Sequence, residues 1–359
     1  MSIHLTINNR RIGPGYPPFI VAEVSANHHG SLDMAIAILD AAKKAGADAV
    51  KLQTYTPDTI TLNSRSDEFM IHSGLWEGRS LYELYSEAYL PWDWHRPIYE
   101  HANKIGLTIF SSPFDFTAVD LLESLDSPAY KIASFEAIDL PLIRYVARTG
   151  KPVIISTGMA NEFEIREAVE AAKGAGCKEL ALLHCVSSYP ADPSEYNLRT
   201  IPKIRDLFDV VVGLSDHTVD NATAVASIAL GANIIEKHFT LDKDGGGADD
   251  SFSLEPLELE ALCRDAQTAF LSLGAPTVGA TNSERENIKF RRSLYFVKDI
   301  RRGETITADS IRSVRPGFGM APKYYDQIIG KKAALDVTMN TPVLKEAVQW
   351  GSEEVQELT

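Results

Sequence analysis

The chain has 359 residues, 45% of them hydrophobic and 23% charged, which is ordinary globular usage and enough for one large domain and a small one. Its 35 Lys and Arg against 49 Asp and Glu give a net charge of −14, which opposes binding to nucleic acid or to an anionic membrane surface. No apolar run approaches the ~20 residues that span a bilayer. The three cysteines lack paired spacing and the N-terminus lacks a signal-peptide pattern, so we expect a cytoplasmic protein.

Short β-branched runs alternate with amphipathic helical segments from about residue 17 to 275. Apolar strands that are each followed by a helix are typical of parallel strands buried on both faces. Eight such units indicate an α/β fold of the (β/α)8 TIM-barrel type, since the first strand lacks the glycine-rich turn of an open dinucleotide-binding sheet. The predicted strands are 19–24, 49–55, 107–113, 129–134, 152–157, 179–186, 210–217 and 233–239.

A long insertion, residues 56–92, follows the second predicted strand and carries Trp76, Trp92 and several tyrosines. Loops of this length are usually functional or disordered, and the aromatic content argues against disorder. Because the loops that follow barrel strands lie on the active face, we predict that this segment covers the substrate.

The pattern changes in kind after a polar linker at 276–292. Residues 293–349 contain short strand-like runs and turn residues but no long helix, which predicts a small β-rich domain. A domain of about 60 residues buries only a marginal core, so we expect it to pack on its own barrel or on a partner's. The predicted organisation is a barrel domain at 1–275, the linker, the small domain and a tail at 350–359.

Polar and ionisable residues lie at or near the end of every predicted strand. Such groups are almost never buried unpaired, and barrel active sites are built at the C-terminal ends of the strands. The ring therefore predicts an enzyme. Its members are Glu23, Lys51, Gln53, Ser111, Ser112, Lys131, Ser134, Glu136, Ser156, Thr157, His184, Ser187, Tyr189, Ser215, Asp216, His217, Glu236, Lys237 and His238.

Two histidines, His217 and His238, end neighbouring predicted strands and can converge. Imidazole suits a divalent metal, and the nearby carboxylates favour manganese or a similar ion over a closed structural zinc site. The alternative is that both are hydrogen-bonded core residues.

Lys51 and Lys131 form a second cluster with the hydroxyls of Ser134, Ser156 and Ser215. Cationic and hydroxyl donors suit a phosphorylated or carboxylated substrate. Two alternatives stay open: each lysine pairs with a carboxylate inside the barrel, or one of them forms a Schiff base as in aldolases.

The chain resembles the sialic acid synthase family in a series of motifs that follow the family's order: FIVAEVSANHHGS, GADAVKLQTY, SSPFD, YKIASFE, ISTGM, LLHCVSSYP, VGLSDHT, EKHFTLDK and SLEP. Its last part resembles that family's antifreeze-like SAF domain of β-clip fold, in RRSLYFVKDIRRGE, RPGFGMAP and IIGKKA. The resemblance spans about residues 17 to 349. It implies condensation of phosphoenolpyruvate with an N-acetylated amino sugar to give a nonulosonic acid and phosphate.

Within that family, GLWEGRSLYELYSEAYLPWDWH and GGGADDSFSLEP resemble the pseudaminic acid synthases. Neuraminate synthases typically have a GPDH tetrad where this chain has GADD, residues 247–250. The implied sugar is 2,4-diacetamido-2,4,6-trideoxy-L-altrose. Synthesis of N-acetylneuraminate or legionaminate from another acetamido sugar is the alternative.

The resemblance also implies roles for individual residues. His217 and His238 match metal ligands for manganese, or for magnesium or cobalt in its place, and Arg315 matches an arginine that the SAF domain sends into the site across a domain-swapped homodimer. Glu23 or Glu136 is the expected base for the attacking water. Sugar-contacting positions are matched by Glu23, Gln53, Tyr189 and Asp249, and the phosphoenolpyruvate pocket by Lys51, Ser112, Lys131, Ser134, Glu136, Ser156 and Ser215.

Overall fold

The computed structural model describes residues 3–351, and the chain divides between Gly274 and Ala275 into two compact units. The predicted tail at 350–359 lies outside the described residues from position 352 onward. Among residues 3–351, no helix is both long and apolar enough to cross a bilayer.

The first unit is a closed barrel of eight parallel strands, which confirms the predicted (β/α)8 architecture. The barrel order follows the chain order, and the last strand closes on the first. Each observed strand lies within its predicted range. The strands are β3 (Phe19–Glu23), β4 (Ala49–Thr54), β5 (Thr108–Pro113), β6 (Tyr130–Ile132), β7 (Val153–Ser156), β8 (Leu180–Cys185), β9 (Val211–Asp216) and β10 (Ile234–His238).

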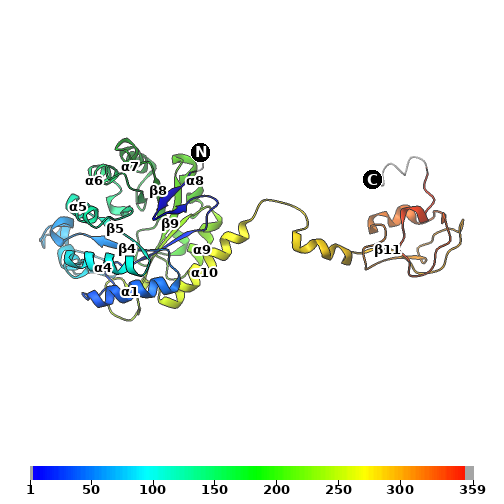
Figure 1. Cartoon of the computed structure of the whole chain (residues 1–359), viewed down its shortest axis with the longest axis horizontal. Helices are drawn as coiled ribbons and strands as arrows, with labels where there is room; N and C mark the ends of the chain where they lie inside the picture. Colours follow the sequence, from blue (N-terminus) through cyan, green and yellow to red (C-terminus); the bar gives the residue numbers. More distant parts are fainter. Residues whose placement is uncertain (1–2, 352–359) are drawn as a thin grey trace. The chain divides into compact units, whose positions relative to one another are not determined.

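A helix follows each barrel strand, and these helices surround the sheet (Figure 1). The first of them begins at a serine cap, where Ser31 accepts from the Met34 amide, and ends at Gly46 in the left-handed conformation. The helices are α1 (Leu32–Ala45), α4 (Trp92–Lys104), α5 (Phe116–Ser124), α6 (Leu140–Ala147), α7 (Glu162–Gly174), α8 (Thr200–Phe208), α9 (Ala222–Ala229) and α10 (Pro256–Leu273).

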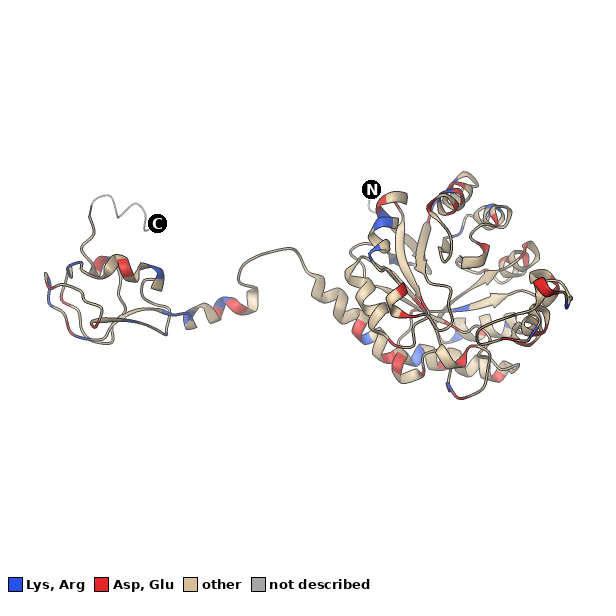
Figure 2. Ribbon diagram, turned by 180° about the vertical axis from the view of Figure 1, so that it is seen from behind, with Lys and Arg blue, Asp and Glu red and all other residues tan. Residues whose placement is uncertain are grey.

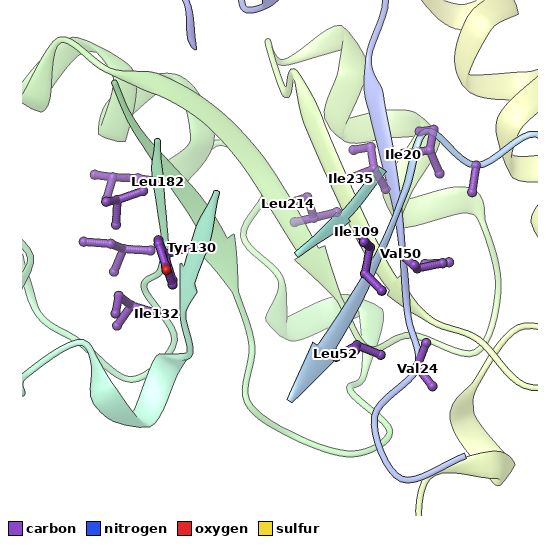
Figure 3. Packing of buried hydrophobic residues seen from close by; sticks show 14 of the residues in the cluster. Ile20, Val24, Val50, Leu52, Ile109, Tyr130, Ile132, Leu182, Leu214 and Ile235 are labelled. Carbon is purple, nitrogen blue, oxygen red and sulfur yellow. The ribbon is translucent and has the colours of Figure 1, made fainter. Parts of the chain in front are cut away.

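Side chains alternate between the two faces of each strand, because successive residues of a strand point to opposite sides. Outward residues such as Val50, Leu52 and Ile235 pack against the helices in one large apolar cluster (Figure 3). Inward residues in the N-terminal halves of the strands, such as Phe19 and Ile234, form a second cluster inside the barrel. The inward positions further along each strand are therefore left to form the site.

A short antiparallel hairpin, β1 (Leu5–Ile7) and β2 (Arg10–Ile12), precedes the barrel and was not predicted. Its residues Leu5, Ile7 and Ile12 are fully buried and join the inner cluster, so the hairpin closes the N-terminal end of the barrel. The two-residue turn at Asn8 and Asn9, both with positive φ, is the type that a tight hairpin requires.

The 56–92 insertion is ordered around short helices. They are α2 (Pro57–Ile60), the 3-10 turn η1 (Asp67–Phe69) and α3 (Leu81–Ala88), the last of which begins with a capping box between Ser80 and Glu83. Further single 3-10 turns follow β6, β8 and β10, at η2 (Ser134–Glu136), η3 (Pro193–Glu195) and η4 (Asp250–Phe252).

The second unit contains one short antiparallel pair, β11 (Ser293–Phe296) and β12 (Ile311–Val314), together with isolated β-bridges. Its own core includes Leu294, Phe296, Ile306 and Val343. A 3-10 segment, η5 (Asn282–Phe290), occupies most of the predicted linker. The remaining elements are η6 (Pro322–Tyr324), α11 (Tyr325–Ile328) and η7 (Lys345–Ala347).

Candidate active site

Strand parity divides those members of the predicted polar ring that lie on strands into two groups. Those that share a face with the inner cluster converge inside the C-terminal end of the barrel; they are Glu23, Lys51, Gln53, Ser112, Lys131, Ser156, Ser215, Glu236 and His238. Four others lie on the outward face: Ser111, His184, Asp216 and Lys237.

The outward residues have structural partners. Lys237 Nζ lies 3.0 Å from Asp216 Oδ2 and donates to the carbonyl of Thr218 at 2.7 Å, which fixes the chain after β9. Ser111 bonds to Thr54, and His184 contacts the carbonyl of Tyr196. These side chains hold the loops and do not line the interior.

Two buried lysines meet one carboxylate inside the barrel. Glu236 Oε1 lies 3.2 Å from Lys131 Nζ and 3.3 Å from Lys51 Nζ, and it accepts from Ser215 Oγ at 3.3 Å. Lys51 Nζ also lies 2.9 Å from Glu23 Oε2. The prediction that the lysines cluster holds, and the pairing with carboxylates that was left open is present. Figure 2 shows charged residues on the barrel strands as well as on the surrounding helices.

These pairs set the protonation of the cluster. Burial alone would raise the pKa of Glu236, but the two ammonium groups outweigh it and lower that pKa. Burial lowers the pKa of Lys131 and raises that of Glu23. Two cations against two carboxylates make the cluster close to neutral, so an anionic ligand needs further positive charge or a protonated carboxyl.

Hydroxyl groups lie at the C-terminal ends of β5, β6 and β7, beside the lysine cluster. Ser112 Oγ accepts from Lys51 at 3.3 Å, and the buried Ser156 Oγ has no hydrogen-bond partner. A Cβ built on Gly158 would lie 2.3 Å from Ser187 Oγ and 2.7 Å from Ser134 Oγ. Only glycine fits at this position, because any side chain would clash with the hydroxyls of Ser187 and Ser134.

Glu136 is a carboxyl group with an unpaired oxygen and a raised pKa. It follows β6 in the turn η2, and its Oε2 is buried with no hydrogen-bond partner. Burial raises the pKa of Glu136 to about 7. A carboxyl group whose pKa lies near neutral pH can exchange a proton during a reaction.

A hydrogen-bonded chain links β3, β4 and the loop after β10. Gln53 Nε2 donates to Glu23 Oε1 at 2.9 Å and to Ser25 Oγ at 3.0 Å, and Ser25 donates to Asp249. Ser25 has a positive φ of 47°, which is uncommon for a residue other than glycine and aims its hydroxyl at the carboxylate. Asp249 Oδ2 lies 3.7 Å from His238 Nδ1.

The two predicted metal ligands lie side by side, with ring centroids 5.4 Å apart. His217 Nδ1 is 2.7 Å from the carbonyl of Val186, which fixes the ring, and His238 Nδ1 is buried without a hydrogen-bond partner. Burial lowers the pKa of His238 well below its usual value, so its ring is neutral, as a metal ligand must be. Within residues 3–351 no group of three or more His, Cys, Asp or Glu could hold an ion.

Aromatic rings pack around the two histidines. The ring of Tyr189 lies 4.3 Å from that of His217 and 5.9 Å from that of Trp76. Trp76 in the 56–92 insertion donates to the carbonyl of Ala248 at 3.1 Å, so the insertion does reach the site. Trp92 begins α4 and donates to the carbonyl of Tyr55, which is a structural contact.

Two residues of the site were not singled out from the sequence, and a third, Glu236, was placed in the polar ring but given no role. Glu236 is the shared partner of both lysines, Ser25 orients Asp249, and Cys185 places its sulfur 4.0 Å from His217 Nδ1. Strand parity was the available signal for Glu236 and Cys185, since both lie on the inward face. Arg315 lies in the second unit, exposed and directly after β12, and its place in the site stays a prediction.

Comparison with known proteins is decisive for the family. Residues 38–277 match the NeuB family and residues 291–349 match the SAF domain. The chain belongs to the NeuB family. The predicted membership of the sialic acid synthases, with a C-terminal SAF domain, is thereby confirmed.

Several relatives of this NeuB protein are similar over most of its length. A pseudaminic acid synthase from Campylobacter jejuni is 46% identical over 89% of this chain and 93% of its own, and one from Helicobacter pylori is 43% identical over 93% and 98%. The solved structure of an N-acetylneuraminic acid synthetase from Leptospira borgpetersenii is 32% identical, with a TM-score of 0.72 over 80% of this chain and 96% of that one.

Proposed function

We propose that this NeuB protein is a pseudaminic acid synthase that condenses phosphoenolpyruvate with 2,4-diacetamido-2,4,6-trideoxy-L-altrose and water to give pseudaminic acid and phosphate. The observation that carries the proposal is the pair of buried lysines, Lys51 and Lys131, that converge among hydroxyls inside the barrel. The sugar assignment rests on the two relatives named as pseudaminic acid synthases, at 46% and 43% identity.

Phosphoenolpyruvate suits the lysine and serine side of the cavity. Its carboxylate and phosphate would be bound by the two ammonium groups and by the hydroxyls of Ser112, Ser134, Ser156 and Ser215. Because the lysine–carboxylate cluster is close to neutral, binding of this anion is assisted when a further cation is present. This charge requirement supports both a divalent metal and an arginine from the SAF domain.

The sugar suits the other side, where Gln53, Ser25 and Asp249 form a polar chain beside Tyr189. In the reaction, C3 of phosphoenolpyruvate forms a bond to the aldehyde carbon of the open-chain sugar, whose oxygen takes up a proton. Water adds to C2, and the resulting tetrahedral carbon becomes the product ketone as its C–O bond to phosphate breaks. Glu136 is the better candidate for the base that takes a proton from that water, because Glu23 is already paired with Lys51. The bound lysines hold the enol face against the aldehyde.

The two histidines would hold a divalent ion, preferably manganese, with magnesium or cobalt as substitutes. The unpartnered Nδ1 of His238 and the fixed ring of His217 support this, and two protein ligands would leave positions open for water or substrate. When bound, the ion would polarise the aldehyde oxygen of the sugar.

We further propose a cytoplasmic homodimer in which the SAF domain of one subunit supplies Arg315 to the barrel of the other. The small size of that domain's core supports the need for a partner surface, and Cys177, Cys185 and Cys263 all being free thiols supports a reducing compartment.

The experiment that tests the function measures phosphate release from phosphoenolpyruvate with a panel of acetamido sugars. We expect turnover with the altrose derivative to exceed that with N-acetylmannosamine by orders of magnitude, since a polar site left unpaired by the wrong sugar discriminates strongly. Equal turnover of the two sugars would overturn the pseudaminate assignment. Borohydride trapping of a lysine adduct with substrate would instead support the Schiff-base alternative.

A further inference from the structure

Two consecutive aspartates in the loop after β10 point to different partners. Asp249 accepts from Ser25 and lies 3.7 Å from His238, on the predicted sugar side of the site. Asp250 contacts His29, which follows β3 in the same segment as Ser25. The segment between β3 and α1 therefore contacts the glycine-rich loop, residues 242–250, through two neighbouring carboxylates.

Asp250 is only 1% exposed and is fully hydrogen-bonded. Its Oδ2 lies 2.7 Å from His29 Nε2 and 2.7 Å from the amide nitrogen of Gly247, and its Oδ1 accepts from Thr240 Oγ1 at 2.6 Å. Thr240 lies just beyond the end of β10. This one carboxylate thus joins the end of a barrel strand, the glycine-rich loop and the β3–α1 segment.

The glycines of the loop are required by the approach of His29. A Cβ on Gly247 would lie 2.5 Å from His29 Nε2 and 2.8 Å from Asp250 Oδ2, and one on Gly245 would lie 2.7 Å from His29 Cε1. All three distances are shorter than non-bonded atoms allow. The loop can close on the imidazole only because these two positions carry no side chain.

The loop is held from a second direction by the 56–92 insertion. Trp76 Nε1 donates to the carbonyl of Ala248, which lies between Gly247 and Asp249 in the sequence. A groove of about 300 Å³ lies between the loop, His29 and the end of α3, where Glu87 and Ala88 form its far wall. The position of Asp249 therefore depends on contacts of the glycine-rich loop that lie outside the barrel interior.

We propose that His29 and Asp250 form a positioning pair that fixes the glycine-rich loop and thereby sets the affinity for the sugar, without acting on phosphoenolpyruvate. The pair touches neither Lys51 nor Lys131; its effect reaches the site through Asp249, the next residue along the loop. The proposal rests on the proposed function for its substrate, but the loop geometry that it invokes can be measured separately.

The kinetic test compares His29→Ala, His29→Gln and Asp250→Asn with the native enzyme, using 2,4-diacetamido-2,4,6-trideoxy-L-altrose and phosphoenolpyruvate. We expect His29→Ala to raise the KM for the sugar about tenfold, the effect of losing one hydrogen bond to a charged group, while the KM for phosphoenolpyruvate stays within about twofold. His29→Gln, which retains a donor, should recover most of the loss. The double variant His29→Ala/Asp250→Asn should be no worse than the more affected single variant.

The chain offers a matched control. His101 Nε2 and Asp40 Oδ1 form a second imidazole–carboxylate pair at the same 2.7 Å, between α4 and α1, where the carboxylate is exposed. His101→Ala should leave both KM values unchanged. An unchanged sugar KM in His29→Ala, or an equal rise in both KM values, would overturn the positioning role.

A second measurement does not depend on turnover. Lys243 lies in the same loop, where its ammonium group pairs with Glu258 at 2.6 Å. We expect trypsin to cleave after Lys243 several-fold faster in His29→Ala than in the native protein or in His101→Ala, because local opening of the loop becomes more frequent. If the native enzyme does not use the altrose sugar but cleavage still accelerates, the proposed function fails while the loop contact stands. Unchanged cleavage would overturn the contact itself.

Discussion

The two ends of the barrel are built from the same eight strands but have opposite interiors. At the N-terminal end, inward residues such as Phe19, Leu183 and Ile234 are apolar, and a hairpin closes the opening. At the C-terminal end, Glu23, Lys51 and Glu236 are buried to a similar degree but are charged. The difference is that each buried charge has an opposite partner within about 3.3 Å. One end supplies stability and the other chemistry.

Removal of the proposed metal ion should have the largest effect on activity, and it should affect only the C-terminal end of the barrel. We expect excess chelator to abolish phosphate release and manganese to restore it, because the histidines His217 and His238 belong to the charged end alone. The His217→Ala variant should lose activity by orders of magnitude while its far-UV circular dichroism stays native. Full activity in excess chelator would show that the two histidines are core residues.

In β10 an inward apolar residue, Ile234, lies two positions before an inward charged residue, Glu236. We expect Glu236→Gln to lower kcat/KM by about 10³-fold or more, because Lys51 and Lys131 lose the carboxylate that positions them. Ile234→Ala should instead lower the free energy of unfolding by about 2–5 kcal/mol and leave kcat nearly unchanged. Urea unfolding and steady-state kinetics on both variants measure the contrast. A kcat loss in Ile234→Ala as large as that in Glu236→Gln would remove the distinction between the two ends.

The sequence predicted this division only in part. The eight strands were found because their apolar runs and following helices repeat, but the N-terminal hairpin was missed although Leu5 and Ile7 alternate before Asn8 and Asn9. The predicted ring of polar residues grouped Lys51 with Lys237. The alternation of side chains along a strand distinguishes them, because Lys51 points inward and Lys237 outward. The meeting of Lys131 with Glu236 was beyond sequence, since β6 and β10 are not neighbours in the sheet and their contact crosses the barrel. The placement of Arg315 in the site was expected from a family resemblance alone and stays a prediction.

The variant Glu136→Gln tests whether a carboxyl group with a pKa near neutral pH acts as the base at the charged end. Burial raises the pKa of Glu136 to about 7, so we expect kcat/KM to rise about tenfold per pH unit below that value and to level off above it. Glu136→Gln should lower the rate by about 10²–10⁴-fold and abolish this limb. A pH profile that keeps the same limb in Glu136→Gln would assign the base elsewhere, with Glu23 next in line.

The same residue makes a prediction about stability. In the native state the Glu136 carboxyl keeps a proton that the unfolded chain releases above its ordinary pKa, so this group makes stability fall as pH rises from the ordinary value to about 7. Glu136→Gln removes that loss. Its melting temperature relative to the native protein should therefore increase across this pH range and stay constant above it. A difference that does not change with pH would contradict the raised pKa.

The smallest expected effect comes from Arg315, and it tests whether the site is formed by one subunit or by two. Arg315 is exposed after β12, and the loss of its charge-assisted hydrogen bond in Arg315→Ala should weaken sugar use by ~1.5–3 kcal/mol with little change in phosphoenolpyruvate binding. The assembly is tested by mixing Arg315→Ala with Lys131→Ala after dissociation and reassociation. In a swapped dimer one intact barrel receives the partner subunit's arginine, so the mixed sample should regain part of the native rate, whereas each variant reassociated alone should not. Persistent inactivity of mixed dimers, verified by mass, would mean that each SAF domain serves its own barrel.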